Sequence, residues 1–585
     1  MNKTIQHPVF IAIIVALGGF LLGFDGVVNG GAVPFYKSTF GIADRPMLIG
    51  LSSSIIILGG IMGNFSIGFL SERLGRKPIL LMTSILFMAG AAGTALAPNI
   101  GMFIVAKLIA GLGVGWAILV APMYIAEIAP PKNRGWLVTF NQLNIVLGVS
   151  IAMFSNYYIL NAIQDPNLNW RWMLGVGFFP AVLYFILLFL VPESPRWLIQ
   201  KGRREEGKAL LAKIIGTQQA EEEYAKIQKN LANADQEEKA SLKELFSRKM
   251  RFVLIIGFGL AIFQQLSGIN AVLYYAPMVF ANAGTGLDAA FLMAIAVGLT
   301  LTIATVISMF LIDRLGRKPL LIIGTSIIIV AFGLVTYAFN QGSYQLDKVK
   351  IQKITSQIYE SAVVSAAQVQ FPDNLLVQNS EVDVRNVNDV KLYNEGKLVA
   401  TVDMSTEPLG RAKRDVKELR ETLQRVEGVT HNSEITFFNT IKEELFKRYE
   451  PNQQKYIQTL YSESYKSLIL NEAININITT VLLGILGFIA GFSISLGPVM
   501  WAMFSEIFPN KMRAMAIAIV GVANGLTSFA VATVFPIQLE YLGSANTYLI
   551  FGLCMVLCLL FLLKYIPETK GKSLEELENE LIKKS

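Results

Sequence analysis

Long apolar runs recur along this chain and constrain its fold more than any other feature. Each run covers about 18 to 25 residues, the length of helix needed to cross a hydrocarbon core of roughly 30 Å. Hydrophobic residues make up 53% of the 585 residues and charged residues only 16%, which is far too apolar for a soluble enzyme of this length. We therefore predict a polytopic membrane protein with twelve spans, near residues 8–30, 46–70, 79–97, 101–126, 137–160, 173–191, 252–282, 287–312, 319–339, 478–504, 514–536 and 545–565.

The basic residues predict the orientation of these spans. The formal net charge is +7, and Lys and Arg gather in loops that the twelve spans place on one side. By the positive-inside rule that side is cytoplasmic, so both termini are expected in the cytoplasm. The basic segments are 72–77, 131–135, 198–251, 313–318, 510–513 and the C-terminal tail.

The chain also contains an internal repeat. RLGRKPILL at 73–81 returns as RLGRKPLLI at 314–322, 241 residues later, whereas AEIAPPKNRG at 126–135 returns as SEIFPNKMRA at 505–514, 379 residues later. The two halves are therefore copies, and the second copy contains about 138 extra residues. Parallel repeats of six helices, with substrate bound near the midplane between them, build one large class of secondary transporters.

We accordingly predict an all-α polytopic membrane protein, with twelve transmembrane helices in two six-helix halves and a small extracytoplasmic inserted domain. The expected parts are an N-terminal half at 1–198, a cytoplasmic amphipathic helical linker at 199–250, a C-terminal half at 251–340 and 472–585, and the insertion at 341–471.

The insertion follows the ninth span, which places it outside the membrane on the extracytoplasmic side. Its middle, 381–404, alternates apolar and polar residues around an Asn-Glu-Gly turn and predicts a β-hairpin. The flanks 345–369, 409–427 and 434–470 carry apolar residues at helical spacing. Structureless connections of this length are rare, so we expect a folded cap whose binding partner is unknown.

Residues that would carry enzyme chemistry are sparse. Cys554 and Cys558 lie one turn apart on the last span, where two small apolar residues are the simplest interpretation. His7 and His431 lie outside the spans. Metal-ligand spacings, nucleophile elbows and phosphate-binding Gly loops are not evident. We expect a protein that is not an enzyme and that uses no cofactor, metal or nucleic-acid partner.

Polar residues within the spans are therefore the candidates for function, because they are costly in a bilayer unless they find partners. Gln264, Gln265, Asn270 and Tyr274 in the seventh span offer amide and phenol groups that suit a polyhydroxyl ligand. Hydrogen bonding between helices is the alternative role. Asp25 in the first span must be paired, protonated or in contact with a water-filled cavity.

Several motifs together resemble the sugar porter family of the major facilitator superfamily. They are PESPRWL at 192–198, GRKP in both halves, QQLSGINAVLYYAP at 264–277 and PETKGKSLEEL at 567–577. The resemblance covers the whole chain except the insertion and implies the major facilitator fold. It also implies sugar contacts by the four polar residues of the seventh span and by Gln142, Gly497, Trp501 and Asn524. For Trp501, a place in an interfacial aromatic belt is the alternative.

The same resemblance gives Asp25 a role. In the family an acid at this position accompanies proton symport, whereas facilitators have a neutral residue there. The family's partner is an Arg on the fourth span, and the matching residue here is Lys107, a point charge without the planar fork of Arg. A permanent Asp25–Lys107 ion pair without a transport role is the alternative.

Three other positions depart from the family pattern. Leu22 replaces an aromatic residue three positions before Asp25, Leu301 replaces an Asn on the eighth span, and Gly525 replaces an aromatic residue beside Asn524. These changes predict a wider and less polar pocket on that side and leave the identity of the sugar open.

Charged residues at the cytoplasmic helix ends are expected to form ion pairs that hold the inside closed, as the family implies; topology signals in solvated loops are the alternative. They are Glu72, Arg73, Arg76, Glu127, Arg134, Glu193, Arg196, Asp313, Arg314, Arg317, Glu506, Arg513 and Glu568.

The sequence thus predicts a transporter in the lipid bilayer of a bacterial inner membrane that takes up a monosaccharide, a hexose or pentose, by proton symport. A facilitative uniporter is the nearest alternative. A sugar sensor that does not transport, and a membrane-anchored interaction protein whose insertion carries the function, are the others.

Overall fold

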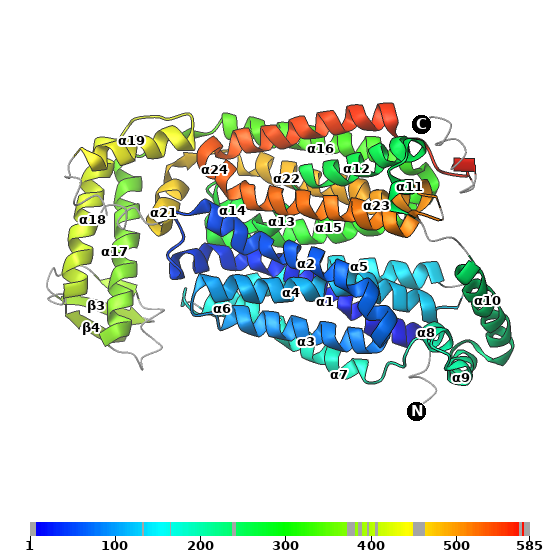
Figure 1. Cartoon of the computed structure of the whole chain (residues 1–585). Coiled ribbons are helices and arrows are strands. Elements are labelled where there is room, and N and C mark those ends of the chain that lie inside the picture. The colour runs from blue at the N-terminus through cyan, green and yellow to red at the C-terminus, as the bar shows by residue number, and fades with distance from the viewer. Residues whose placement is uncertain are drawn as a thin grey trace.

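The computed structural model describes residues 8–130, 134–163, 165–236, 241–370, 381–383, 389–394, 397–403, 407–447, 463–509, 511–572 and 576–577. Within them it forms an elongated helical bundle with a smaller unit at one end and short helices at the other (Figure 1). The N-terminal half consists of α1 Pro8–Thr39, α2 Pro46–Leu74, α3 Arg76–Ala95, α4 Ile100–Ile128, α5 Arg134–Ala162, α6 Asn169–Gly175 and α7 Phe178–Leu188. The C-terminal half consists of α12 Arg251–Leu266, α13 Ile269–Tyr274, α14 Ala276–Ala281, α15 Leu287–Leu315, α16 Arg317–Asn340, α22 Ile478–Ile494, α23 Leu496–Ile507 and α24 Arg513–Tyr565.

The predicted twelve spans are confirmed. The described residues contain 11 helical stretches long and apolar enough to cross a membrane. The last of them, α24, has 53 residues, about twice what one crossing requires. Its helical geometry is interrupted at Gly543, where φ is 75° and ψ is 167°, a backbone conformation that glycine adopts without steric cost. This break divides α24 into the eleventh and twelfth spans.

The repeat is visible in the turns as well as in the helices. Gly75 ends α2 with φ of 97°, and Gly316 ends α15 with φ of 91°, so the RLGRK motif makes the same left-handed turn in both halves. Each turn leads directly into the next span, α3 or α16. A side chain at either position would be strained, which explains why this motif retains its glycine.

Small residues bring helices of the N-terminal half into close contact. Gly59 and Gly63 of α2 face Gly111 and Gly115 of α4, and a Cβ added at Gly59 would lie 2.4 Å from the Leu108 carbonyl oxygen. Stripes of glycine spaced by four residues are a common interface between membrane helices. This packing fixes the position of α4 within the half.

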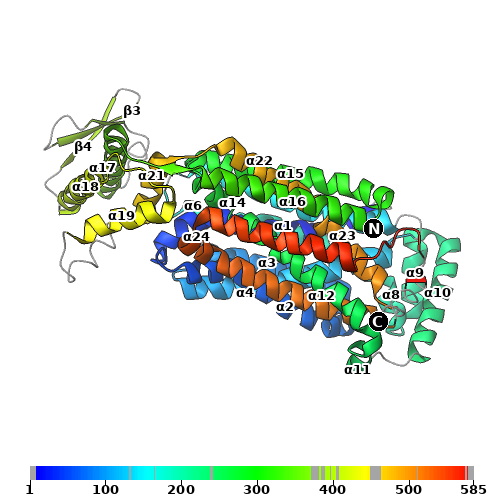
Figure 2. The ribbon, with the colours of Figure 1, turned by 90° about the horizontal axis from the view of Figure 1, so that it is seen from above.

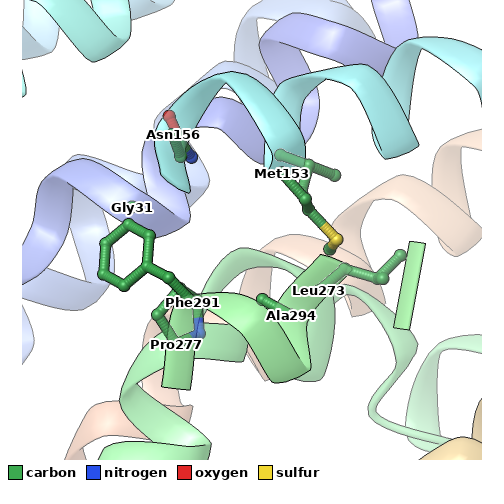
Figure 3. A pocket seen from close by; sticks show the side chains of 8 residues that line it. Gly31, Met153, Asn156, Leu273, Pro277, Phe291 and Ala294 are labelled. Atoms are coloured by element: carbon green, nitrogen blue, oxygen red, sulfur yellow. The ribbon is translucent and has the colours of Figure 1, made fainter. Parts of the chain in front are cut away.

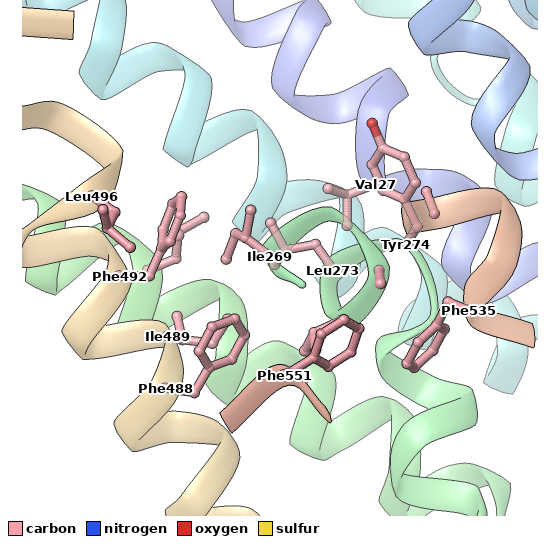
Figure 4. Packing of buried hydrophobic residues seen from close by; sticks show 14 of the residues in the cluster. Val27, Ile269, Leu273, Tyr274, Phe488, Ile489, Phe492, Leu496, Phe535 and Phe551 are labelled. Atoms are coloured by element: carbon pink, nitrogen blue, oxygen red, sulfur yellow. The ribbon is translucent and has the colours of Figure 1, made fainter. Parts of the chain in front are cut away.

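Aromatic and aliphatic side chains fill the C-terminal half. Phe332 of α16 lies 4.6 Å, between ring centroids, from Phe488 of α22 and 5.9 Å from Phe551 of α24. Figure 4 shows Ile269 and Leu273 of α13 next to this group. The broken seventh span is therefore anchored against two other helices of its own half.

Among the described residues, the seventh and tenth spans are broken at residues whose backbone angles are not helical. The seventh span breaks at Gly268, which has φ of 79°, so α12 ends and α13 begins at Ile269. The tenth span breaks at Ser495, with φ of −120° and ψ of −93°, between α22 and α23. Such breaks leave backbone groups free to bond with side chains or ligands in the middle of a membrane.

The smaller unit corresponds to the predicted insertion. It consists of α17 Lys348–Gln370, β2 Glu381–Asp383, β3 Asp389–Asn394, β4 Lys397–Asp403, α18 Glu407–Arg425, α19 Glu434–Phe446 and α21 Glu463–Ala473. The predicted hairpin is confirmed: β3 pairs antiparallel with β4, and the turn between them lies outside the described residues. The predicted helical flanks are confirmed except for 448–462, which lies outside the described residues.

The unit has its own core and a narrow base. Leu423, Phe437 and Ile441 are among the buried residues of a cluster separate from that of the bundle. At the base, β1 Ser343–Tyr344 pairs antiparallel with β5 Ile474–Asn475, where the chain leaves and re-enters the bundle. α19 also contacts the bundle, since Ile435 lies 3.5 Å from the position of a Cβ at Gly543.

The predicted linker helices are also observed. They are α8 Pro195–Gln200, α9 Arg204–Ile215, α10 Thr217–Gln236, α11 Leu242–Leu245 and the short 3-10 helix Arg248–Met250. Ile199, Leu211 and Ile227 form a small buried cluster among them. Figure 2 shows these helices at the end of the bundle opposite the insertion, where α1 begins and α24 ends.

Candidate functional site

A cluster of hydrogen-bonded amides lies where the seventh span breaks. The Gln265 side chain donates from Nε2 to Gln264 Oε1 (3.0 Å) and to Asn524 Oδ1 (3.1 Å). Asn524 donates from Nδ2 to Gln264 Oε1 (2.7 Å), and Asn270 donates to Gln265 Oε1 (3.0 Å). Four of the eight predicted sugar-contacting residues therefore form one network between α12, α13 and α24.

The discontinuous helices hold this network in place. Gln264 donates to the backbone carbonyl of Leu496 (3.1 Å), the first residue after the break in the tenth span. Asn524 donates to the carbonyl of Ala261 (2.9 Å), and Asn270 donates to Ser528 Oγ (2.6 Å). Gln264, Gln265 and Asn524 are 5–8% exposed. Buried amides can exchange these bonds for bonds with sugar hydroxyls, because an amide both donates and accepts.

Ser528 is a member of this network that the sequence analysis did not include. It lies four residues after Asn524, and residues at that spacing share one face of a helix. Ser528 could therefore have been predicted from the sequence, because it lies one helical turn after Asn524, a residue that was already a candidate.

The second feature is a charged pair in the N-terminal half. Asp25 of α1 and Lys107 of α4 lie 3.6 Å apart, measured from Oδ1 to Nζ, with side chains 17% and 1% exposed. Lys107 lies one turn before Gly111, so the glycine contact between α2 and α4 positions it. The structure thus brings together the two residues predicted for proton coupling.

One oxygen of Asp25 remains available. Its Oδ2 is buried and has no hydrogen-bond partner among the described residues. Next to it, a Cβ added at Gly26 would meet no atom within 4 Å. Tyr274 of α13 lies within electrostatic range of the carboxylate. Asp25 therefore lies between its own half and the span that carries the amide cluster.

The remaining predicted sugar contacts do not join the amide network. Gln142 of α5 is exposed, and Trp501 of α23 is 45% exposed, with its ring 5.7 Å from that of Phe504. Gly497 lies one turn before Trp501, and a Cβ there would lie 3.2 Å from the Phe492 ring.

The predicted widening of the pocket is not found at Gly525 in this conformation. A Cβ at that position would lie 2.8 Å from the Ile61 side chain of α2, so the opposite half fills the space. Leu301 is 7% exposed within the bundle, and Leu22 packs against the core of the N-terminal half.

A small cavity lies between the halves, lined by Val27, Gly31, Met153, Asn156, Leu273, Pro277, Phe291 and Ala294 (Figure 3). Its volume is about 10 Å³, room for about one water molecule and not for a sugar. Asn156 donates to the carbonyl of Val28 (2.9 Å), while its Oδ1 is buried without a described partner. This cavity is therefore too small to be the sugar site.

The halves are in close contact at the end that carries the insertion. Ser54 of α2 and Thr533 of α24 are hydrogen-bonded at 2.6 Å between their hydroxyl oxygens. A Cβ at Gly50 would lie 2.0 Å from the carbonyl oxygen of Thr533, and one at Gly30 would lie 2.8 Å from that of Tyr274. These residues belong to the parts of α1, α2, α13 and α24 nearest the insertion, so the bundle is closed there.

A charged cluster lies at the opposite end of the N-terminal half. Arg76 forms a two-bonded ion pair with Glu127, at 2.9 and 3.1 Å, and both side chains are less than 10% exposed. Glu193 Oε1 accepts from the backbone N–H groups of Arg76 (2.9 Å), Lys77 (3.2 Å) and Ser194 (2.7 Å). α3, α4 and the segment after α7 are thus held together.

The C-terminal half repeats this cluster. Arg317 pairs with Glu506 at 2.8 Å, and Thr569 donates to the same carboxylate. Glu568 accepts from the backbone N–H groups of Arg317 (3.1 Å) and Lys318 (3.1 Å). Burial opposes the ionisation of Glu568, but the surrounding backbone donors hold its pKa below the usual range.

The other predicted charged residues lie at the edges of these two clusters or outside them. Asp313 lies 3.6 Å from Arg317 and is 80% exposed, and Arg513 donates to the carbonyl of Phe508. Arg73 lies over the Phe69 ring, and Arg196 is exposed. Glu72 and Arg314 take part through their backbone carbonyls, which accept from Trp197 and Lys570. The side chain of Arg134 lies outside the described residues.

A polar group of the N-terminal half was not anticipated. Asn29 of α1 donates to Ser53 Oγ (3.0 Å), and the Tyr36 hydroxyl is hydrogen-bonded to Ser52 Oγ (2.9 Å). Asn29 follows Asp25 by one turn. Asn29 could have been predicted from the sequence, because it is a polar residue on the same face of α1 as Asp25.

Comparison with known proteins identifies the family to which the chain belongs. The model of the family described as sugar (and other) transporters matches residues 11–357 and 459–581, and the gap between these segments lies within the insertion.

Curated relatives match over nearly their whole length. The chain is 30% identical to the arabinose-proton symporter of Bacillus subtilis, over 100% of this chain and 97% of that protein. It is 32% identical to the probable inositol transporter 2 of Arabidopsis thaliana, over 98% and 91%.

Solved structures agree with this result. The inward-open xylose transporter XylE of E. coli is 26% identical, with a TM-score of 0.66 and coverage of 98% of this chain and 99% of that one. Its partially occluded inward-open form has a TM-score of 0.61. The chain therefore belongs to the sugar transporter family and has the major facilitator fold.

Proposed function

We propose that this protein takes up a monosaccharide, a hexose or pentose, together with a proton. The observation that carries the proposal is a partly buried carboxylate paired with a lysine in one half, together with a buried amide network in the other. The names of the relatives support it, since they include arabinose-proton and D-xylose-proton symporters.

In this proposal the amide network recognises the sugar. Gln264, Gln265, Asn270 and Asn524 exchange bonds among themselves for bonds with hydroxyls, which keeps every buried polar group satisfied. Tyr274 and Gly497 border the site, and Gln142 and Trp501, whose side chains are exposed, contact the sugar from outside the network. The exposed Trp501 ring offers a face for an apolar side of the sugar.

Asp25 is the proposed proton carrier. Lys107 stabilises its charged form while the two side chains are close. When α1 and α4 part, the carboxylate loses this partner and takes up a proton, so its protonation depends on the conformation of the bundle. Binding of sugar to the second half then occurs next to a neutral Asp25.

The conformation supports alternating access. The halves are closed at the insertion end, while each charged cluster at the other end is built within one half. The clusters centred on Arg76 and Arg317 are proposed to pair across the halves in the outward-facing state. New pairs formed across the halves at this exposed end would contribute only about 0–1 kcal/mol each, so they act as a set.

The proposed topology follows from the charges. The basic end of the bundle, with α8 to α11, faces the cytoplasm with both termini, and the insertion is extracytoplasmic. A bacterial inner membrane is the proposed location.

Facilitated diffusion is the second candidate, favoured by one observation. Lys107 is 1% exposed and already paired with Asp25, which is also the geometry of a permanent structural ion pair. The similarity to a probable inositol transporter extends the substrates to be tested to cyclic polyols.

The test is uptake into proteoliposomes that contain the full chain. Labelled pentoses, hexoses and inositol are supplied with and without an inward proton gradient. We expect one monosaccharide to accumulate above its equilibrium concentration only with the gradient. Equilibration regardless of the gradient would support a facilitator, and lack of any uptake would support a sensor or anchor.

A further inference from the structure

A groove lies outside the transport path, at the start of the seventh span. It has a volume of about 480 Å³ and is lined by Phe246, Ser247, Arg248, Arg251, Leu254, Ile255 and Phe258. These residues come from the end of α11, the 3-10 helix that follows it and the first two turns of α12. Its volume is in the range of small-molecule sites in proteins.

The groove is cationic at one end. Arg248 and Arg251 are exposed, and neither forms an ion pair with a described carboxylate. The nearest acid along the chain, Glu244, is occupied by Lys511 at 3.1 Å. The Ser247 hydroxyl, directly before Arg248 in sequence, adds a donor to the lining of the groove. Unpaired arginines that converge on a groove favour a phosphate, since the guanidinium fork matches its oxygens.

The other end of the groove is apolar. Leu254, Ile255 and Phe258 lie on the first two turns of α12 as it enters the span, and Ile255 is 40% exposed. Phe246, 58% exposed, stands at the edge of the groove. Figure 2 shows α11 at the margin of the bundle, beside the start of α12. In this arrangement the two arginines lie at the membrane surface, and the apolar residues of α12 lie along the hydrocarbon region.

We propose that this groove binds one anionic phospholipid, with its phosphate on Arg248 and Arg251 and an acyl chain along Leu254, Ile255 and Phe258. The order of groups along the groove indicates this occupant. The arginines come first and the apolar residues of α12 follow, and a phospholipid has its phosphate and its acyl chain in the same order. Basic residues beside a membrane span attract anionic lipids and lose this attraction as salt is raised. The site is independent of the sugar and proton residues.

The test is native mass spectrometry of the purified full chain with phosphatidylglycerol or with phosphatidylcholine of the same acyl chains. We expect tighter retention of phosphatidylglycerol. Replacing both arginines, R248Q with R251Q, should weaken that retention by about 10-fold or more, because each guanidinium removed takes away a charge-assisted hydrogen bond to the phosphate. The double lysine variant, R248K with R251K, should keep most of it and shows that the fold tolerates changes there.

The matched control removes the same charge from neighbouring exposed lysines that do not line the groove, K243Q with K249Q. It should retain phosphatidylglycerol like the natural chain. Equal loss in the control would overturn the proposal, because the binding would then be a general surface effect. Equal retention of the two lipids, or displacement of phosphatidylglycerol by inorganic phosphate at the same concentration, would overturn it too.

Discussion

The two halves of this protein are copies of one repeat, yet their first spans carry different chemistry. α1 opens the N-terminal half and carries Asp25, which is paired with Lys107. The seventh span opens the C-terminal half and carries Gln264, Gln265 and Asn270, which bond to one another and to Asn524. At the end of the bundle opposite the insertion, both halves have the same Arg–Glu cluster. The repeat therefore supplies the scaffold, and the difference between the first spans supplies the proposed function.

The largest effect on transport is expected from removing the carboxylate charge of Asp25 in the N-terminal half. Asp25→Asn should abolish proton-driven accumulation of sugar and leave exchange of labelled for unlabelled sugar intact, because the amide network is unchanged. Both are measured in the same proteoliposomes. Loss of exchange together with accumulation would mean that Asp25 serves binding or folding, and the division between the halves would be wrong.

The next effect comes from the C-terminal half. Gln265→Ala removes a donor to two amides and an acceptor for Asn270, leaving buried groups unsatisfied at about 1–3 kcal/mol. Sugar affinity should fall roughly 10- to 100-fold, measured by titration of intrinsic fluorescence. Asn144→Ala is the control, since among the described residues the Asn144 side chain donates to the carbonyl of Phe140, within α5 itself. A similar loss in the control would contradict a recognition role specific to the network.

Burial distinguishes the two charged clusters. Arg76 and Glu127 have side chains 8% and 6% exposed, against 17% and 20% for Arg317 and Glu506. Glu127→Gln leaves a more deeply buried cation, so it should cost about 3 kcal/mol or more, and Glu506→Gln about 1.5–3 kcal/mol. Thermal unfolding in detergent compares them. The exposed pair of Arg203 and Glu206 provides the control, and Glu206→Gln should leave Tm unchanged.

The smallest effect is expected from the insertion, which only the C-terminal half contains. Tyr344 and Ile474 are partners across the β1–β5 ladder, so residues 345–470 can be replaced by a short Gly-Ser linker. Uptake should stay within about twofold, because the unit has its own core. Complete loss of activity in a folded deletion variant would instead support the interaction-protein alternative.

The sequence predicted the architecture well because its signals are local. Apolar length identified the twelve spans, alternation identified the β3–β4 hairpin, and the repeated RLGRK motif predicted the division into halves. These features depend on residues close together in the chain.

Features that depend on long-range packing were not predicted. The hydrogen bond from Gln264 to the Leu496 carbonyl joins residues 232 positions apart. It requires the helix break at Ser495, which the local amino-acid composition does not predict. Gly525 was expected to widen the pocket, but Ile61 of the other half fills the space. Such contacts depend on how the two halves pack, and that is set by the whole bundle.

Proton movement caused by sugar tests the central claim most directly. The full chain is reconstituted into lightly buffered proteoliposomes without a preset gradient, and the external pH is followed as the transported sugar is added. The account predicts an immediate rise in external pH that is absent with Asp25→Asn, because protons enter with the sugar. Sugar entry in the natural chain without any change in external pH would contradict it.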